Sequence, residues 1–295
     1  MVGEIAGLCA AACWALGSLL FSRIGRRTTP EAMNLGKCLI AGLLLSATAL
    51  LIGSGPWVSG PAGVWLVLSA IAGLTIGDTA YFGALVRLGL SPALLLLSSA
   101  PAFTALGGWV FLDEPLTSRD LAGIGAVSVG IGLVVWQPRK AGKAPGTERR
   151  VVVGVALGVL AAIGQASGSL LSKRAMVLGL TPLQTGGGRL LVGGLVLALF
   201  LTLRGKIAPV ARELSADRTW LRVAGASLVG SYAGIWLAQI AIDGARSTGI
   251  AATLLGTSPI FALPIARIAG EKIEARAVVG ALLGVGGVAL LTSSA

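Results

Sequence analysis

The 295-residue chain contains no histidine and only three cysteines, and only 12% of its residues are charged. Without histidine the familiar metal sites are hard to build, so we expect no metal and no cofactor. Cys9, Cys13 and Cys38 lie within apolar stretches and are expected to pack as small apolar side chains. Since a soluble domain carries about 25% charged residues, this composition excludes an ordinary soluble protein and a disordered chain.

Motifs of the common enzyme classes are also absent. The chain has no Gly-x-x-x-x-Gly-Lys-Ser/Thr loop for a nucleotide, and it has no Gly-x-Ser-x-Gly or zincin pattern. The net charge of +11 comes from small basic groups in the loops between apolar runs. We therefore expect neither an enzyme nor an ATP-driven pump, and no nucleic-acid partner.

Hydrophobicity is what the chain has in abundance. Hydrophobic residues make up 55% of it, glycine adds 44 residues, and the mean hydropathy is +0.89. A helix rises 1.5 Å per residue, so about 20 apolar residues cross the hydrocarbon core of a bilayer. The sequence predicts an all-α polytopic membrane protein with ten transmembrane helices, at 3–22, 31–52, 62–86, 91–111, 119–136, 151–172, 182–203, 219–242, 248–268 and 275–292.

The two halves of the chain resemble each other. A polar stretch at 137–150 divides the sequence near its middle and is expected to be a linker between repeats at 1–136 and 151–295. Matching features recur in the same order in both halves: Gly17-Ser18-Leu19-Leu20 with Gly168-Ser169-Leu170-Leu171, Lys37 with Arg189, Trp65-Leu66 with Trp220-Leu221, Ala100-Pro101-Ala102-Phe103 with Ser258-Pro259-Ile260-Phe261, and Glu114 with Glu271. Because each half holds five spans, an odd number, the second repeat must cross the membrane in the opposite sense, as in many secondary transporters.

The most specific part of this pattern resembles the EamA-type branch of the drug/metabolite transporter superfamily. The resemblance rests on the stretch from Pro101-Ala102-Phe103 to Phe111-Leu112-Asp113-Glu114-Pro115-Leu116 and on its echo from Pro259-Ile260-Phe261 to Gly270-Glu271-Lys272-Ile273. Two features depart from the family pattern: Ala100 and Ser258 stand where an acidic residue often precedes the proline, and Asp113 replaces the usual glycine. The resemblance implies two five-helix repeats and a membrane carrier, often an exporter, whose substrates vary widely within the family.

The distribution of basic residues predicts an orientation. Most lysines and arginines fall in the loops after the first, third, fifth, seventh and ninth spans. The positive-inside rule then places these loops in the cytoplasm and both termini outside. Relatives of this kind are usually drawn with both termini inside, so the two arguments conflict.

Three ionisable residues lie within the predicted spans and are candidates for function. Lys37 and Asp78 are expected at similar depth from the same membrane face, where they would pair, or where Asp78 would take a proton. Arg189 is the counterpart of Lys37 in the second half and could hold a carboxylate or phosphate of a substrate. For all three, a structural alternative remains: snorkelling of the basic side chains or a purely structural ion pair.

Uncharged side chains supply the remaining candidate binding residues. Tyr232, Trp236 and Gln239 recur at helical spacing and predict one polar and aromatic face. Trp14 and Gln165 lie on shorter faces of the first and sixth spans. Such side chains suit a small-molecule pocket, but an aromatic stripe in a helix bundle also serves packing alone.

Proline and glycine predict how the helices bend and pack. Pro101 and Pro259 are predicted hinges within the fourth and ninth spans, because proline frees a backbone carbonyl. Glycines of the fifth and tenth spans predict close helix packing, either of these spans on each other or on a second copy in a homodimer.

Together these features predict a secondary transporter that moves a small polar or amphipathic metabolite by alternating access. The alternative is a lipid or amphiphile flippase. An ion gradient must supply the energy where transport is coupled, and Asp78 is then the candidate proton carrier. The composition suggests a multi-pass protein of a bacterial inner membrane, surrounded by lipid. Substrate, direction and coupling ion stay open.

Overall fold

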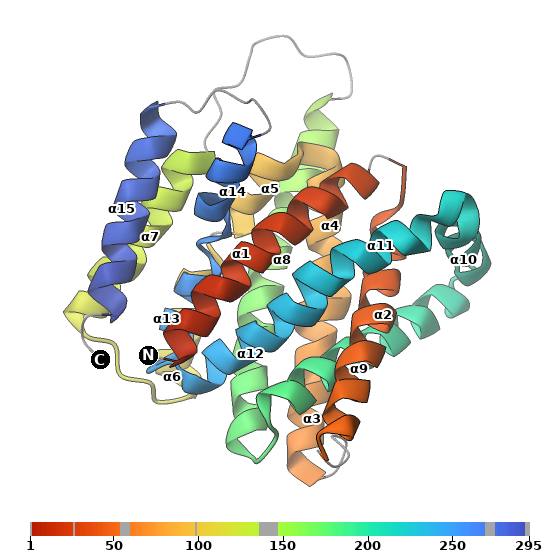
Figure 1. Ribbon diagram of the computed structural model, residues 1–295, viewed down its shortest axis with the longest axis horizontal. Coiled ribbons are helices and arrows are strands. Elements are labelled where there is room, and N and C mark those ends of the chain that lie inside the picture. The colour runs from red at the N-terminus through yellow and green to blue at the C-terminus, as the bar shows by residue number, and fades with distance from the viewer. Residues whose placement is uncertain are drawn as a thin grey trace.

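The computed structural model describes residues 2–25, 27–53, 60–97, 99–135, 147–268 and 275–292, and every regular element within these ranges is a helix (Figure 1). The first half contains α1 (Val2–Ile24), α2 (Pro30–Leu51), α3 (Gly60–Ser69), η1 (Ala70–Asp78), α4 (Thr79–Leu88), α5 (Leu90–Leu97), α6 (Ala100–Phe111) and α7 (Ser118–Val135). The second half contains α8 (Thr147–Val177), α9 (Pro182–Leu203), α10 (Ile207–Ser215), η2 (Ala216–Arg218), α11 (Thr219–Ser227), η3 (Leu228–Ala233), α12 (Gly234–Gly244), α13 (Thr248–Leu255), α14 (Ser258–Ile268) and α15 (Ala275–Thr292).

Six helical stretches of the described residues are long and apolar enough to cross a membrane by length and composition, and they include 60–88 and 207–244, the second of which is kinked at Asp217 and Arg218. Shorter apolar helices, Ala100–Phe111, Thr248–Ala262 and Val278–Leu291, lie within the predicted fourth, ninth and tenth spans. The predicted fourth span consists of two helices, α5 and α6, and the predicted ninth span consists of α13 and α14. Neither span is therefore one long helix.

Two stretches differ from the sequence prediction. The predicted linker 137–150 lies outside the described residues as far as 146, and its last four residues already form the first turn of α8, where the Arg150 guanidinium donates to the Val86 carbonyl at 3.0 Å. Glu271 also lies outside the described residues. Between α9 and α11, where the sequence predicted only a loop, α10 forms a short helix that buries Val210.

Equivalent helices of the two halves begin with equivalent caps. The Thr29 hydroxyl caps α2, and Pro30 occupies the first turn, where its missing N–H costs nothing. The Thr181 hydroxyl caps α9 in the same way, again with proline in the first turn, and Gln184 completes a capping box. These caps fix the starting points of the helices that carry Lys37 and Arg189.

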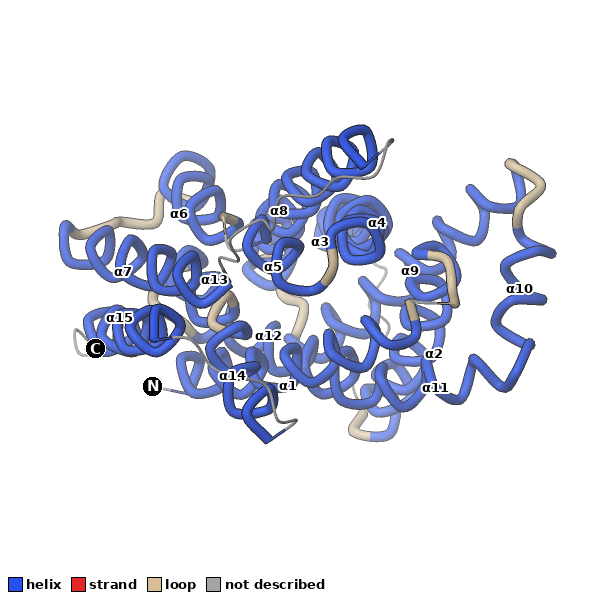
Figure 2. The backbone as a smooth tube through the Cα atoms, turned by 90° about the horizontal axis from the view of Figure 1, so that it is seen from above, coloured by secondary structure: helices blue, strands red, loops and turns tan. Residues whose placement is uncertain are grey.

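Packing joins helices of one half to helices of the other. The main pairs are α2 with α9, α6 with α13, and α7 with α15, together with α1 against α11, η3 and α12, and α8 against α3, η1 and α4. Figure 2 shows α7 and α15 side by side at one end of the molecule and α10 at the other.

Glycines permit the closest of these approaches. A Cβ on Gly130 of α7 would lie 2.5 Å from the Gly280 carbonyl oxygen and 2.7 Å from the Gly284 nitrogen of α15. A Cβ on Gly17 of α1 would lie 2.7 Å from the Cα of Gly230 in η3. The predicted close packing of the glycine faces is therefore confirmed, and in this chain the partner of α7 is α15.

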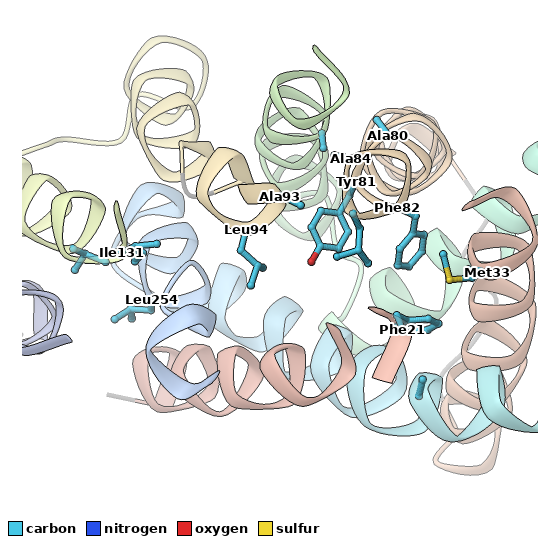
Figure 3. Close-up of a cluster of buried hydrophobic side chains, with 14 of the residues drawn as sticks. Phe21, Met33, Ala80, Tyr81, Phe82, Ala84, Ala93, Leu94, Ile131 and Leu254 are labelled. Carbon is cyan, nitrogen blue, oxygen red and sulfur yellow. The ribbon is translucent and has the colours of Figure 1, made fainter. Parts of the chain in front are cut away.

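The largest apolar cluster extends from α1, α2 and α4, with Phe21, Met33 and Phe82, to α7 and α13, with Ile131 and Leu254 (Figure 3). Phe21 and Phe82 lie 5.1 Å apart between ring centroids, and Tyr81 and Met33 are buried beside them. The Tyr81 hydroxyl bonds to Ser18 at 3.3 Å. This cluster positions one wall of the cavity described next.

Candidate functional site

A cavity with a volume of about 140 Å³ lies between helices of both halves. A cavity needs only about 10–15 Å³ to hold a single water molecule, so this space is large enough for several waters or for a small metabolite. All three predicted mid-span ionisable groups line it. The other lining residues are mostly apolar or small: Trp14, Gly17, Ser18, Phe21, Leu74, Gly77, Tyr81, Phe82, Leu94, Leu97, Ala100, Pro101, Ala161, Gln165, Ser169, Gly230, Ser231, Ile235, Ala238, Gln239, Ile242, Ala252, Leu255, Gly256, Ser258 and Pro259.

Lys37 and Asp78 form an ion pair in the wall of this cavity. The side chain of Lys37 is 5% exposed and that of Asp78 is 21% exposed. The ammonium of Lys37 also lies over the Phe82 ring, 5.5 Å from its centroid, where the ring face attracts a cation. The predicted pairing of these two residues is confirmed.

The position of Asp78 depends on an irregular helix. Asp78 is the last residue of η1, a π-helical segment, whose turns are wider than those of an α-helix because its hydrogen bonds run from residue i to i+5. Asn34 of α2 supplies a donor there: its side-chain amide donates to the Leu74 carbonyl at 2.7 Å and to the Thr79 hydroxyl at 2.8 Å. The Thr75 hydroxyl donates to the Gly193 carbonyl of α9 at 3.1 Å.

Sequence reasoning missed Asn34, although a signal was present. Asn34 is a fully buried amide in a predicted span, and it lies one helical turn before Cys38, whose thiol bonds to it at 3.4 Å. A polar side chain inside an apolar helix needs a hydrogen-bond partner. The search for charged groups alone passed over it.

Arg189 lies across the cavity in a different environment. It is 4% exposed, and its Nη1 donates to the Ser172 hydroxyl at 3.2 Å, which in turn donates to the Gln239 side-chain oxygen at 2.5 Å. The guanidinium fits between two glycines: a Cβ on Gly73 or Gly168 would lie 2.8 or 2.9 Å from Nη2. Its Nε has no hydrogen-bond partner among the described residues.

The structure gathers most, but not all, of the predicted site residues. Trp14 and Gln165 line the cavity, and so does Gln239. Tyr232 and Trp236 do not: they pack against each other, 6.3 Å between centroids, and the Tyr232 hydroxyl lies 3.0 Å from that of Thr48. The predicted common face assumed regular α-helical spacing, whereas Tyr232 belongs to the π-helical segment η3, whose wider turn changes its phase relative to α12. Trp236 belongs to the regular helix α12, and its ring packs against Tyr232.

Pro101 and Pro259 both line the cavity, close to the points where the fourth and ninth spans break. The Ser99 hydroxyl donates to the Leu96 carbonyl at 2.7 Å, and the Ser258 hydroxyl donates to the Leu255 carbonyl, four residues before Pro259, at 3.1 Å. Each proline thus lies in the first turn of a new helix, α6 or α14, instead of within one continuous span, and hinge motion at these points stays a prediction.

A polar cluster joins the loop after α6 to the start of α13. The Glu114 carboxylate accepts the N–H of Thr248 at 2.7 Å and also its hydroxyl, at the N-terminus of α13. The buried Asp120 pairs with Arg246 and accepts the Thr117 hydroxyl at 2.7 Å. These contacts tie the first half to the second on the side where α1 begins.

The backbone at Asp113 explains a departure noted in the sequence. Its φ is 53°, in the left-handed region that glycine adopts most readily and that aspartate tolerates better than most residues. The turn therefore keeps its shape with Asp113 where glycine is usual. Glu114, which follows, can still reach α13.

No group of three or more potential metal-ligating side chains occurs within the described ranges.

Comparisons with known proteins agree with this arrangement. The family model described as EamA-like transporter family matches residues 1–136 and 152–293. The threonine/homoserine exporter RhtA of Escherichia coli strain K12 is 30% identical over 148 residues, which are 48% of this chain and 48% of RhtA. The uncharacterized inner membrane transporter YedA of the same strain is 33% identical over 112 residues, 38% of this chain and 35% of YedA.

These matches thus span about half of RhtA and about a third of YedA. A solved structure, described as the crystal structure of a protein, superposes on this chain with a TM-score of 0.78. The superposition covers 99% of this chain and 97% of the other. At 20% identity, this likeness shows a shared fold.

Proposed function

We propose that this chain, which belongs to the EamA-like transporter family, is a multi-pass secondary transporter of the inner membrane for a small polar or amphipathic metabolite. The observation that carries the proposal is the convergence of Lys37, Asp78 and Arg189 on one cavity. Charged groups are expensive inside a membrane protein, and they persist where they face a pathway or bind a ligand.

We further propose ten spans in two inverted repeats that alternate access to the cavity. The packing supports this proposal, because exchanging the halves preserves most of the main contacts. The pairs α2 with α9 and α7 with α15 map onto themselves, the contacts of α1 with α11 to α12 map onto those of α8 with α3 to α4, and the contacts of α1 with α13 and α14 map onto those of α8 with α5 and α6. The contact of α6 with α13 departs from this symmetry. The repeated Thr-Pro caps and the repeated π-helical segments support it as well.

The name of RhtA suggests small neutral amino acids as first candidates and export as the direction. The cavity is compatible with this choice, because a volume of about 140 Å³ is large enough for a metabolite as small as threonine or homoserine. Coupling to a proton through Asp78 is part of the same proposal.

The proposal is tested by counterflow in proteoliposomes that contain the purified full chain. Vesicles loaded with unlabelled threonine or homoserine are expected to accumulate the labelled compound, and protein-free vesicles are not. Ser231→Phe, which fills the cavity from η3, is expected to abolish accumulation, whereas Leu228→Phe, at a position 48% exposed on the same segment, is expected to retain it.

Absence of counterflow for a broad panel of amino acids, amines, sugars and nucleotides, with folded protein, would refute the proposal. Movement of a fluorescent lipid between leaflets by the same vesicles would then favour the flippase alternative.

A further inference from the structure

The cavity carries an uncompensated charge. Lys37 and Arg189 are both basic and Asp78 is acidic, so one positive charge is left over among the described lining residues. Asp78 is already paired with Lys37. A buried charge without a counter-ion is costly, so the remaining positive charge needs an anion.

Comparison of the halves shows why the surplus falls on Arg189. Lys37 follows the cap residue Thr29 by the same distance as Arg189 follows Thr181. Asp78 ends η1 in the first half, and Ala233 ends η3 at the matching distance from the repeated Trp-Leu pair. The second half thus repeats the cation and the π-helical segment, but it has alanine in place of the carboxylate.

The guanidinium of Arg189 has a hydrogen-bond donor that no described residue uses. Ser172 fixes Nη1, the glycines at 73 and 168 leave room for Nη2, and Nε is buried without a partner among the described residues. A planar guanidinium offers two parallel N–H donors, which match the two oxygens of a carboxylate.

We infer that Arg189 binds the carboxylate of a small monocarboxylate metabolite, which serves as its missing counter-ion. One carboxylate matches the single charge of the guanidinium, whereas a dianion such as a phosphate monoester would bring a second negative charge without a counter-ion. Phe21, Leu74 and Ile235 provide apolar lining for the body of the ligand. Lys37 donates to only one carboxylate oxygen of Asp78, so the other oxygen can accept a hydrogen bond from an amino group of the ligand. This inference rests on the proposed transport function, whose substrate class it specifies.

Three compounds with one carbon skeleton test the inference on the purified full chain. Butyrate and 2-aminobutyrate carry the carboxylate, and 2-amino-1-butanol lacks it. A ligand that binds the folded state raises the apparent melting temperature. At equal ionic strength we expect both carboxylates to raise it and the amino alcohol to leave it unchanged.

Variants locate the effect. In Arg189→Gln we expect at least a tenfold weaker apparent affinity for both carboxylates, and in Arg189→Lys an intermediate loss, because lysine is a point charge without the planar fork. Arg87→Gln is the matched control: Arg87 bonds the Gly83 carbonyl of its own helix at 3.0 Å and does not line the cavity, so its response should equal that of the wild type.

The inference is overturned if the amino alcohol stabilises the wild type as well as the acids do, if none of the three compounds stabilises it, or if Arg189→Gln responds like the wild type. Should Arg189→Gln fail to fold, the wild-type series decides alone. Counterflow separates the two proposals: carboxylate binding that depends on Arg189 without counterflow refutes transport only, whereas counterflow unaffected in Arg189→Gln refutes the site only.

Discussion

Replacing Asp78 by asparagine is expected to destabilise the protein by about 3 kcal/mol, because Lys37 loses its counter-ion inside the protein. Removing one partner of a buried ion pair typically costs about 3–5 kcal/mol. The lower end applies here, since Asp78 is 21% exposed to the cavity and water can replace part of the interaction. The Phe82 ring also continues to attract the ammonium of Lys37.

The double variant separates the interaction energy of the ion pair from the effects of the two single substitutions. Lys37→Met together with Asp78→Asn leaves no unpaired charge at this position, and replacing a buried pair by uncharged side chains is often close to neutral. We therefore expect the free energy of unfolding of the double variant to lie within about 1 kcal/mol of that of the wild type. The coupling energy between the two positions should then be several times the deviation from additivity of independent mutations, which is about 0.5 kcal/mol.

Thermal unfolding of the detergent-purified variants measures these differences. For a chain of this size, 1 kcal/mol corresponds to about 2–4 °C, so Asp78→Asn should lower the apparent melting temperature by about 6–12 °C. Since membrane proteins commonly unfold irreversibly, all variants are compared at one scan rate. If the losses of the two single variants simply add up in the double variant, the pair contributes nothing and the reasoning is refuted.

The same variant tests proton coupling. A carboxylate that carries the coupled proton cannot be replaced by an amide, so Asp78→Asn should lose the response of transport to an imposed pH gradient while it retains counterflow. Full gradient-driven transport by Asp78→Asn would exclude this role.

Further predictions concern packing, the polar cluster and orientation. Gly130→Ala is expected to lose about 1–3 kcal/mol in thermal unfolding, because its Cβ would meet the backbone of α15, whereas Gly125→Ala meets nothing within 4 Å and should be neutral or slightly stabilising. Asp120→Asn should lower stability by about 1 kcal/mol through loss of its charge pair with Arg246, which is 40% exposed, and unchanged unfolding would contradict this. A reporter fused after Ala295 should be active only outside the cytoplasm if the lysine and arginine count sets the orientation, and cytoplasmic activity would overturn that expectation.

The sequence predicted the helical class and the pairing of Lys37 with Asp78 because membrane chemistry restricts both. Few charges are tolerated in a span, so two opposite charges at equal depth have few alternatives to each other. The close packing of the glycine faces was equally predictable, since glycines along one face of a helix let another helix approach its backbone.

The π-helical segments were not predictable from periodicity. They insert a wider turn without any change in composition, so the phase of Tyr232 relative to Gln239 could not be predicted, and Tyr232 lies outside the lining of the cavity. Asn34 was recognisable as a polar side chain within an apolar span, but its partner, the Leu74 carbonyl of η1, depends on the irregular turn.

These irregular segments connect the fold to the proposed transport cycle. Each half contributes a π-helical segment to the wall of the cavity, η1 with Asp78 and η3 with Ser231. They do not offer equivalent charge, because Asp78 accompanies Lys37 and Ala233 occupies the matching position in the second half. Were both cations paired within the protein, a carboxylate would gain little by entering. With one pair complete and one open, the carboxylate of the substrate supplies the counter-ion that Arg189 lacks among the described residues.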